Sequence, residues 1–299
     1  MATPYKFIEI NNLKTWFLMT LFLVLVFGLG YLFAYIFENQ WIFYLAVIFG
    51  LLMNIWSYFY GDKIIVALTK AKKIEERNLP EVYRILENLS ITAGLPKTPD
   101  LYLIDTPVMN AFATGRNPKN ALVAVTTGLI NNLNKEELEG VIAHELAHIK
   151  NYDIKVMMIA TILAGIIAIM ADFFLRFSLY GGGSDRDNKS NVFLFIIGFI
   201  LALLAPIFAQ LIQLAISRKR EFLADATGAL ITRNPLGLAK ALEKISSQKQ
   251  PMDVSPAVAG LFIVNPFKNQ KGIINWLGNL FSTHPPVEER IQALRNMTI

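Results

Sequence analysis

The chain has 299 residues, of which 54% are hydrophobic and only 17% are charged, and its mean hydropathy is +0.43. This composition excludes an ordinary soluble protein and favours a membrane protein with a moderate soluble portion. The net charge is +5, but the basic residues flank apolar segments, which is typical of membrane orientation rather than nucleic-acid binding. There are no cysteines, so any metal must be bound by His, Asp or Glu.

Two uncharged segments near the N-terminus are long enough to cross a membrane. Residues 15–37 and 41–61 can each span the roughly 30 Å hydrocarbon layer as a helix, and only Glu38-Asn39-Gln40 separates them. The first segment is too long for the apolar core of a signal peptide, and no small-residue cleavage site follows it. Residues 1–61 are therefore predicted to form a transmembrane hairpin.

Two later segments, about 154–175 and 192–216, predict a second transmembrane hairpin over residues 154–216. Lysines and arginines flank the outer ends of both hairpins, whereas the short loop within the first hairpin has none. Since positive residues favour the cytoplasmic side, we expect four spans with both termini in the cytoplasm.

The remaining residues form two soluble parts, 62–153 and 217–299. In the first part, residues 80–93 have apolar side chains on one helical face and Gly94 follows them, which predicts a helix that ends there. Three short apolar segments bounded by Pro, Gly and Asn predict the strands of a small sheet, namely 101–104, 111–114 and 121–125. The predicted fold is a mainly α membrane protein with a cytoplasmic α+β domain.

The next predicted helix carries the strongest chemical motif. Residues 134–137, Asn-Lys-Glu-Glu, have the spacing of a capping box, and residues 143–148 read Ala-His-Glu-Leu-Ala-His. Because His144 and His148 are four residues apart, they share one helix face and can bind one metal ion, while Glu145 can act on a water without being a ligand. The motif predicts a catalytic, zincin-like metal site, although two solvent-exposed histidines are the alternative.

A catalytic zinc site usually has three protein ligands and one open position, so a third ligand is expected. Glu221 and Asp225 are the best candidates, because the second hairpin begins just after His148 and ends just before Glu221. The stretch from His148 to Ile154 is about 9 Å long if it is helical, and Glu221 lies a similar distance beyond Ile216. We expect Glu221 to bind the metal and Asp225 to accept a histidine N–H, although such carboxylate pairs are commonly solvent-exposed. Asp153 could compete as a ligand but is interpreted as the N-cap of the third span.

These motifs resemble those of the HtpX-type membrane metalloproteases, which are relatives of the CaaX prenyl proteases. The resemblance covers essentially the whole chain and rests on residues 143–148, 218–225 (Arg-Lys-Arg-Glu-Phe-Leu-Ala-Asp), 110–115 (Asn-Ala-Phe-Ala-Thr-Gly) and 282–286 (Ser-Thr-His-Pro-Pro). It implies a zinc endopeptidase with one Zn²⁺ per subunit in a prokaryotic plasma membrane. The implied partners are the lipid bilayer and misfolded or damaged membrane proteins, which the enzyme would cut under stress at the cytoplasmic face.

The resemblance also implies roles for residues outside the ligand set. Asn110, Ala111 and Phe112 would belong to an edge strand beside the metal, where an extended substrate pairs through its backbone; equally, Asn110 starts a turn and Phe112 is core. His284 would donate a hydrogen bond to the oxyanion, or simply lie at a helix start. A fourth protein ligand would close the site, so His284 is not assigned to the metal. Arg290 is a weaker candidate for the oxyanion and is more typical of a solvent-exposed helix residue.

The expected chemistry is metal-assisted peptide hydrolysis, in which Glu145 takes a proton from water and returns it to the leaving amine. A non-catalytic metal-binding membrane scaffold remains possible, although it would not need Glu145. A transporter or channel is favoured only by Asp172 and Asn54 in or near apolar segments. Prenyl-peptide cleavage is a narrower rival, but four spans are too few for the large helical barrel of those enzymes.

Overall fold

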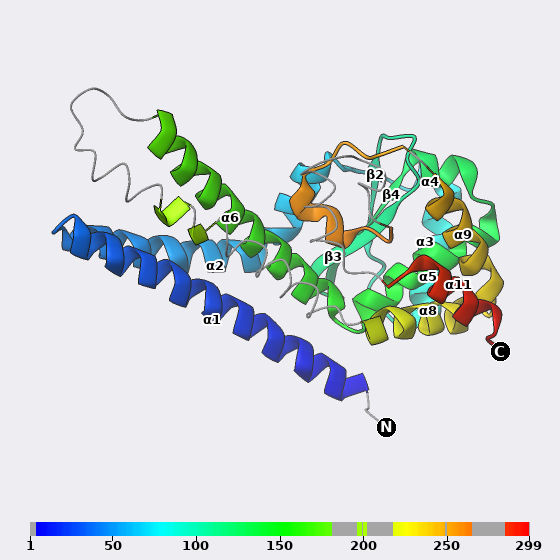
Figure 1. The fold of residues 1–299 in the computed structure, drawn as a ribbon. Coiled ribbons are helices and arrows are strands. Elements are labelled where there is room, and N and C mark those ends of the chain that lie inside the picture. Colours follow the sequence, from blue (N-terminus) through cyan, green and yellow to red (C-terminus); the bar gives the residue numbers. More distant parts are fainter. Residues whose placement is uncertain are drawn as a thin grey trace.

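A computed structural model describes residues 4–180, 196–198, 200–201, 218–248, 250–264 and 285–298. Three long helices, α1, α2 and α6, extend from a body that contains a small sheet and several shorter helices (Figure 1). The apolar helices and the histidine motif therefore occupy different parts of the structure and meet where α6 leaves the body.

The three long helices are apolar enough to cross a membrane. Helices α1 (Pro4–Ile36) and α2 (Gln40–Thr69) pack against each other as a hairpin. Asn39 caps α2 by accepting a hydrogen bond from the Trp41 N–H, which satisfies one free donor at the helix start. Helix α6 (Asp153–Tyr180) packs against both members of the hairpin.

Each of the spans expected at 15–37, 41–61 and 154–175 coincides with one of these helices. The helices are longer than the predicted segments, since α1 begins at Pro4, α2 ends at Thr69 and α6 ends at Tyr180. α2 continues for about two further turns beyond the predicted end of its span, so it carries the chain directly into the body. The fourth predicted span, 192–216, lies almost entirely outside the described residues.

The sheet has four strands in the order β1-β2-β4-β3. Strand β2 (Asp100–Ile104) pairs in parallel with β4 (Asn120–Thr126), and β3 (Ala111–Asn117) pairs antiparallel with β4 at one edge of the sheet. All three predicted strands are confirmed. The short strand β1 (Lys72–Lys73) was not predicted, because two exposed lysines carry no apolar alternation.

The motif helix α5 (Lys135–Lys150) begins with the predicted capping box. The Asn134 side chain accepts a hydrogen bond from the Glu137 N–H, and the Glu137 carboxylate accepts one from the Asn134 N–H, each at 2.9 Å. Helix α3 (Pro80–Ala93), which packs against α5, has the predicted bounds and ends at Gly94 with φ of 71°.

In the part of the chain that the structure describes, four further helices and a 3₁₀ turn belong to the body. In chain order they are α4 (Thr127–Asn132), α8 (Arg218–Thr232), α9 (Pro235–Ser247), the 3₁₀ turn η1 (Pro256–Leu261) and α11 (Val287–Arg295). Helices α8 and α9 pack directly on α5, and α11 packs on α8 and α9. Segments far apart in the sequence therefore meet around the motif helix.

Two glycines allow these helices to approach α5 closely. A Cβ atom on Gly228 of α8 would lie 3.0 Å from the His144 backbone nitrogen. A Cβ on Gly140 of α5 would lie 2.6 Å from the Leu238 nitrogen in α9, which is closer than real Cβ atoms approach backbone. The absence of a side chain at these positions brings α8 and α9 against the motif helix.

We expect Gly140→Ala to lower the free energy of unfolding by about 1–3 kcal/mol, because α9 must shift to admit the methyl group. Unfolding of the detergent-solubilised protein measures this change. Gly165→Ala is the matched control, since its Cβ would meet Ala257 at an ordinary 3.6 Å. Equal stability of the two variants would contradict close α5–α9 packing.

Candidate metal centre

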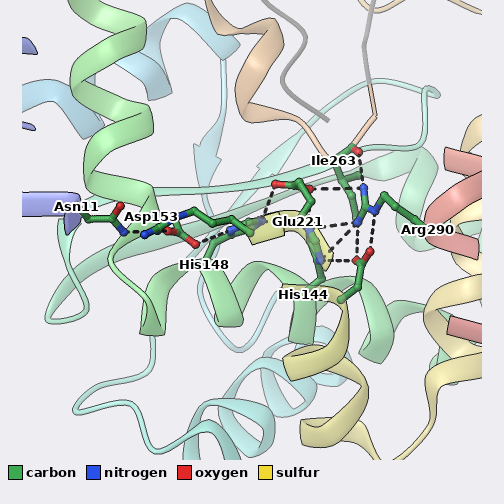
Figure 2. A network of polar contacts seen from close by, with 9 residues as sticks. Asn11, His144, His148, Asp153, Glu221, Ile263 and Arg290 are labelled. Carbon is green, nitrogen blue, oxygen red and sulfur yellow. Dashed lines mark hydrogen bonds and ion pairs between the residues drawn. The ribbon is translucent and has the colours of Figure 1, made fainter. Parts of the chain in front are cut away.

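Three potential metal ligands converge between α5 and α8 (Figure 2). His144 and His148 come from successive turns of α5, and Glu221 comes from the first turn of α8. The two histidine Nε2 atoms are 3.2 Å apart. Glu221 places one carboxylate oxygen 3.4 Å from His148 Nε2 and the other 3.8 Å from His144 Nε2. The structure thus brings together the three residues that were predicted from the sequence to bind the metal.

His144 is oriented by Asp225, one helical turn after Glu221 in α8. The Nδ1 atom of His144 lies 2.9 Å from an Asp225 carboxylate oxygen, which leaves Nε2 directed towards Glu221 and His148. Burial, together with the positive charge of Arg290, lowers the pKa of His144 from 6.5 to about 4. The imidazole is therefore neutral near pH 7, which is the form that binds metals.

His148 is oriented in the same way by Asp153, the first residue of α6. Its Nδ1 atom lies 3.2 Å from an Asp153 carboxylate oxygen, and Asp153 is 3% exposed. From the sequence, Asp153 was expected to be the N-cap of the third span rather than a competing ligand, and α6 does begin there. Its contact with His148 was missed, although an aspartate five residues beyond a candidate ligand offered a signal.

Arg290 is fully buried rather than exposed on the surface of α11, which corrects the expectation of a solvent-exposed residue. Its guanidinium donates two hydrogen bonds to the Asp225 carboxylate, at 2.7 and 2.8 Å, and lies 3.7 Å from Glu221. Burial would raise the pKa of Asp225, but the charge and hydrogen bonds of Arg290 lower it to about 2. Asp225 is therefore ionised when it holds His144.

Glu145 lies on the motif helix beside the three candidate ligands and is 3% exposed. Burial raises the pKa of its carboxyl group to about 7, and the nearby Glu221 contributes in the same direction, whereas His148 opposes it. The carboxyl group also accepts a backbone hydrogen bond from Ala113 of β3. Glu145 is thus placed between the ligand cluster and the edge strand.

The edge strand β3 is partly covered where it begins. Asn110, which is fully buried, donates a side-chain hydrogen bond to the Val264 carbonyl, and Ala111 accepts one from the Ile263 N–H. Phe112 packs against Phe262, with ring centroids 5.2 Å apart, and is core. The structure therefore places Asn110 to Phe112 beneath residues 262–264, whereas Ala113 contacts Glu145 directly. His284 lies outside the described residues.

The donor set fits a catalytic zinc ion. It combines two imidazoles, each held through Nδ1 by a carboxylate, with one buried carboxylate whose oxygens face both Nε2 atoms. Among the described residues, these three form the group that could hold a metal, so no fourth His or acidic residue there closes the site. Three protein ligands with one open position are typical of catalytic zinc.

A buried cluster of two histidines and a glutamate, with a second glutamate beside it on the ligand helix, defines a metallopeptidase type of site. The model of peptidase family M48 matches residues 76–298. A protease HtpX homolog of Syntrophobacter fumaroxidans is 50% identical over 260 residues, covering 85% of this chain and 89% of that protein. One from Caldanaerobacter subterraneus is 44% identical over 306 residues, covering 99% of both. The chain therefore belongs to peptidase family M48.

With its apolar helices, the chain is a membrane metalloprotease. Among solved structures, the crystal structure of S. mikatae Ste24p is similar with a TM-score of 0.47 and 22% identity. The match covers 94% of this chain and 66% of that chain.

Removing Arg290 should destabilise the protein strongly, because Asp225 would remain buried without its partner cation. We expect Arg290→Leu to lower the free energy of unfolding by about 3–5 kcal/mol. Arg295→Leu is the control on the same helix, where the pair with Glu243 is exposed and should contribute less than about 1 kcal/mol. Similar losses in both variants would contradict the buried Arg290–Asp225 pair.

The raised pKa of Glu145 should make the metal-free protein less stable as the pH rises. The folded state keeps the Glu145 carboxyl group protonated up to about pH 7, whereas the ordinary pKa of this group is 4.5. The stability that the protonated carboxyl group contributes is therefore fully present below pH 4.5 and is lost as the pH rises through about 7. Metal-free Glu145→Gln should therefore be more stable than the unsubstituted protein at pH 8, by up to about 3 kcal/mol, and less so at pH 5.

Chemical unfolding of chelator-treated protein at the two pH values measures this difference. Glu139→Gln, a partly exposed position on the same helix, is the control and should show no such pH dependence. A Glu145→Gln advantage that is the same at pH 5 and pH 8 would show that the carboxyl titrates normally.

Proposed function

We propose that the chain is a zinc-dependent endopeptidase that hydrolyses peptide bonds of misfolded or damaged membrane proteins at the cytoplasmic face of a plasma membrane. The observation that carries this proposal is the buried cluster of His144, His148 and Glu221 beside Glu145, in a chain with apolar helices of membrane-spanning length. Membership of peptidase family M48 and the protease relatives support it.

Zinc held by His144, His148 and Glu221 would supply Lewis-acid activation of water and of the scissile carbonyl. Glu145 acts as the general base: a carboxylate oxygen takes a proton from the attacking water and later delivers it to the leaving amine nitrogen. A pKa of about 7 in the metal-free site suits a group that must both accept and donate a proton near neutral pH. The Ala113 N–H holds this carboxyl group in place.

The substrate backbone pairs with β3 beyond the covered start of the strand. Backbone groups of alternate residues point to the same side of a strand, so Ala113 and Gly115 share the outward side of Ala111. The Ala111 carbonyl already accepts a hydrogen bond from the Ile263 N–H. Pairing near Ala113 would lay the scissile bond next to Glu145, while Asn110 anchors residues 263–264 rather than the substrate.

His284 is proposed to donate a hydrogen bond to the oxyanion that develops on the scissile carbonyl. Support comes from Arg290, six residues later, whose guanidinium is fixed against Asp225 and Glu221. Arg290 anchors α11 at the ligand cluster, and His284 precedes it in the sequence by only six positions. Arg290 itself is committed to Asp225 and is not assigned to the oxyanion.

The soluble parts 62–153 and 217–299 act as one cytoplasmic catalytic domain, divided in the sequence by a transmembrane hairpin over residues 154–216. The packing of α8 on α5 supports this, since it joins the two parts at the ligand cluster. The basic residues that flank the spans support a topology of four helices with both termini in the cytoplasm.

Glu145→Gln should abolish cleavage of an unfolded model substrate by the detergent-purified, zinc-loaded protein, with a loss of at least about 100-fold, while one zinc per chain is retained. Glu221→Ala should lose zinc, as measured by atomic absorption after dialysis. Glu139→Gln is the control and should keep both properties. Comparable cleavage by Glu145→Gln would remove it from the mechanism, and full zinc content in Glu221→Ala would remove that ligand.

The same assay distinguishes the alternative function, a non-catalytic scaffold, from an enzyme. A scaffold would bind one zinc and cleave neither soluble nor membrane-embedded substrates. The buried, high-pKa Glu145 favours the enzyme, because a scaffold has no use for an ionisable group that costs stability above pH 7.

A further inference from the structure

The side chain of Asn11 connects helix α1 to the metal centre. This residue is fully buried. Its side-chain nitrogen donates one hydrogen bond to a carboxylate oxygen of Asp153 at 2.9 Å and another to the Asn151 carbonyl at 3.0 Å. Figure 2 shows Asn11, Asp153 and His148 in a row that ends at the candidate ligands. Both N–H donors of the amide are thus used on the corner between α5 and α6.

Asp153, in α6, collects contacts from the three other helices that meet at this point. One carboxylate oxygen accepts hydrogen bonds from Asn11 in α1 and Arg220 in α8, and the other lies 3.2 Å from His148 Nδ1 in α5. The carboxylate belongs to the first residue of α6. Its orientation, and hence that of the His148 ring, depends on the donors that surround it.

The corner itself has a conformation that needs external support. Asn151 caps the C-terminus of α5, Asp153 starts α6, and Tyr152 between them has φ of 61°. A side chain other than glycine rarely adopts this left-handed conformation without surrounding contacts that stabilise it. Asn11 bonds to the residues on both sides of Tyr152 and therefore holds the turn that brings Asp153 beneath His148.

We infer that Asn11 is a positioning residue for the metal centre, which acts on His148 through Asp153, so that the site is complete only when α1 is docked against the α5–α6 corner. This inference rests on the proposed zinc function. The membrane hairpin is then a working part of the catalytic unit as well as its anchor. A displacement of α1 would release Asp153 and loosen one of the two histidine ligands.

A neighbouring contact provides the control. Asn12, the next residue in α1, accepts a hydrogen bond from the Lys155 ammonium at 3.0 Å. It therefore also joins α1 to α6, but its side chain does not bond to Asp153 or His148. If α1 contributes only general packing, the loss of either contact should have similar effects on metal binding. If Asn11 positions the ligand, only the loss of its contact should change zinc affinity and ligand geometry.

The experiment compares full-length Asn11→Leu and Asn12→Ala in detergent. Zinc affinity is measured by competition with a chromogenic chelator, and ligand geometry by the visible spectrum of the cobalt-substituted protein. Asn11→Leu should bind zinc roughly 10-fold more weakly and alter the cobalt spectrum, whereas Asn12→Ala should change neither. In an Asp153→Ala background, Asn11→Leu should cause no further loss. Asn11→Ser, whose hydroxyl is too short to make both bonds, replaces Asn11→Leu if that variant does not fold.

The inference would be overturned if the Asn11 variants had the same zinc affinity and cobalt spectrum as the unsubstituted protein. It would also be overturned if Asn12→Ala lost as much zinc affinity as Asn11→Leu, or if Asn11→Leu lowered the affinity equally in the Asp153→Ala background. Failure of the unsubstituted protein to bind zinc is a different result, because it would overturn the proposed function instead.

Discussion

The hydrogen bonds that the two motif histidines donate to two buried aspartates are the constraint on which the rest of the structure depends. Asp225 holds Nδ1 of His144 and Asp153 holds Nδ1 of His148, so both Nε2 atoms are directed to one point that Glu221 also faces. A histidine pair alone would leave each ring free to rotate and to exchange tautomers. The carboxylates remove that freedom before any metal binds.

Burying two carboxylates beside a metal site requires compensating charge, and the fold supplies an arginine for each. Arg290 from α11 pairs with Asp225, and Arg220 from α8 pairs with Asp153. Because an unpaired buried charge costs several kcal/mol, these helices are held in place by the electrostatics of the site that they surround. The metal centre is therefore also the point at which distant parts of the chain are joined.

Features that depend on local sequence were predictable. The capping box of α5, the glycine end of α3, the strands of the sheet and the apolar spans follow from residues close together in the chain. The candidate ligands could be predicted for a different reason. Metal chemistry limits the residue types, and the hairpin predicted between His148 and Glu221 limits where the chain can return. Strand β1 escaped prediction because its pairing is set by β2 rather than by its own two lysines.

The supporting network could not be read from the sequence in the same way. Asn11 and Asp153 are 142 positions apart, and Arg290 and Asp225 are 65 apart. Neither pair has a local pattern that distinguishes it from a helix cap or a solvent-exposed salt bridge. An arginine on a short polar helix is normally exposed, and only the packing of α11 against α8 and α9 buries Arg290. Charge pairs of this kind are set by tertiary structure.

X-ray absorption at the zinc edge of the full-length, zinc-loaded protein tests the central claim most directly. We expect one zinc with two imidazole ligands at about 2.0–2.1 Å and oxygen ligands in the remaining positions, with an identical spectrum in His284→Ala. A third imidazole that disappears in that variant, or a single imidazole in the unsubstituted protein, would contradict a site built from His144, His148 and Glu221.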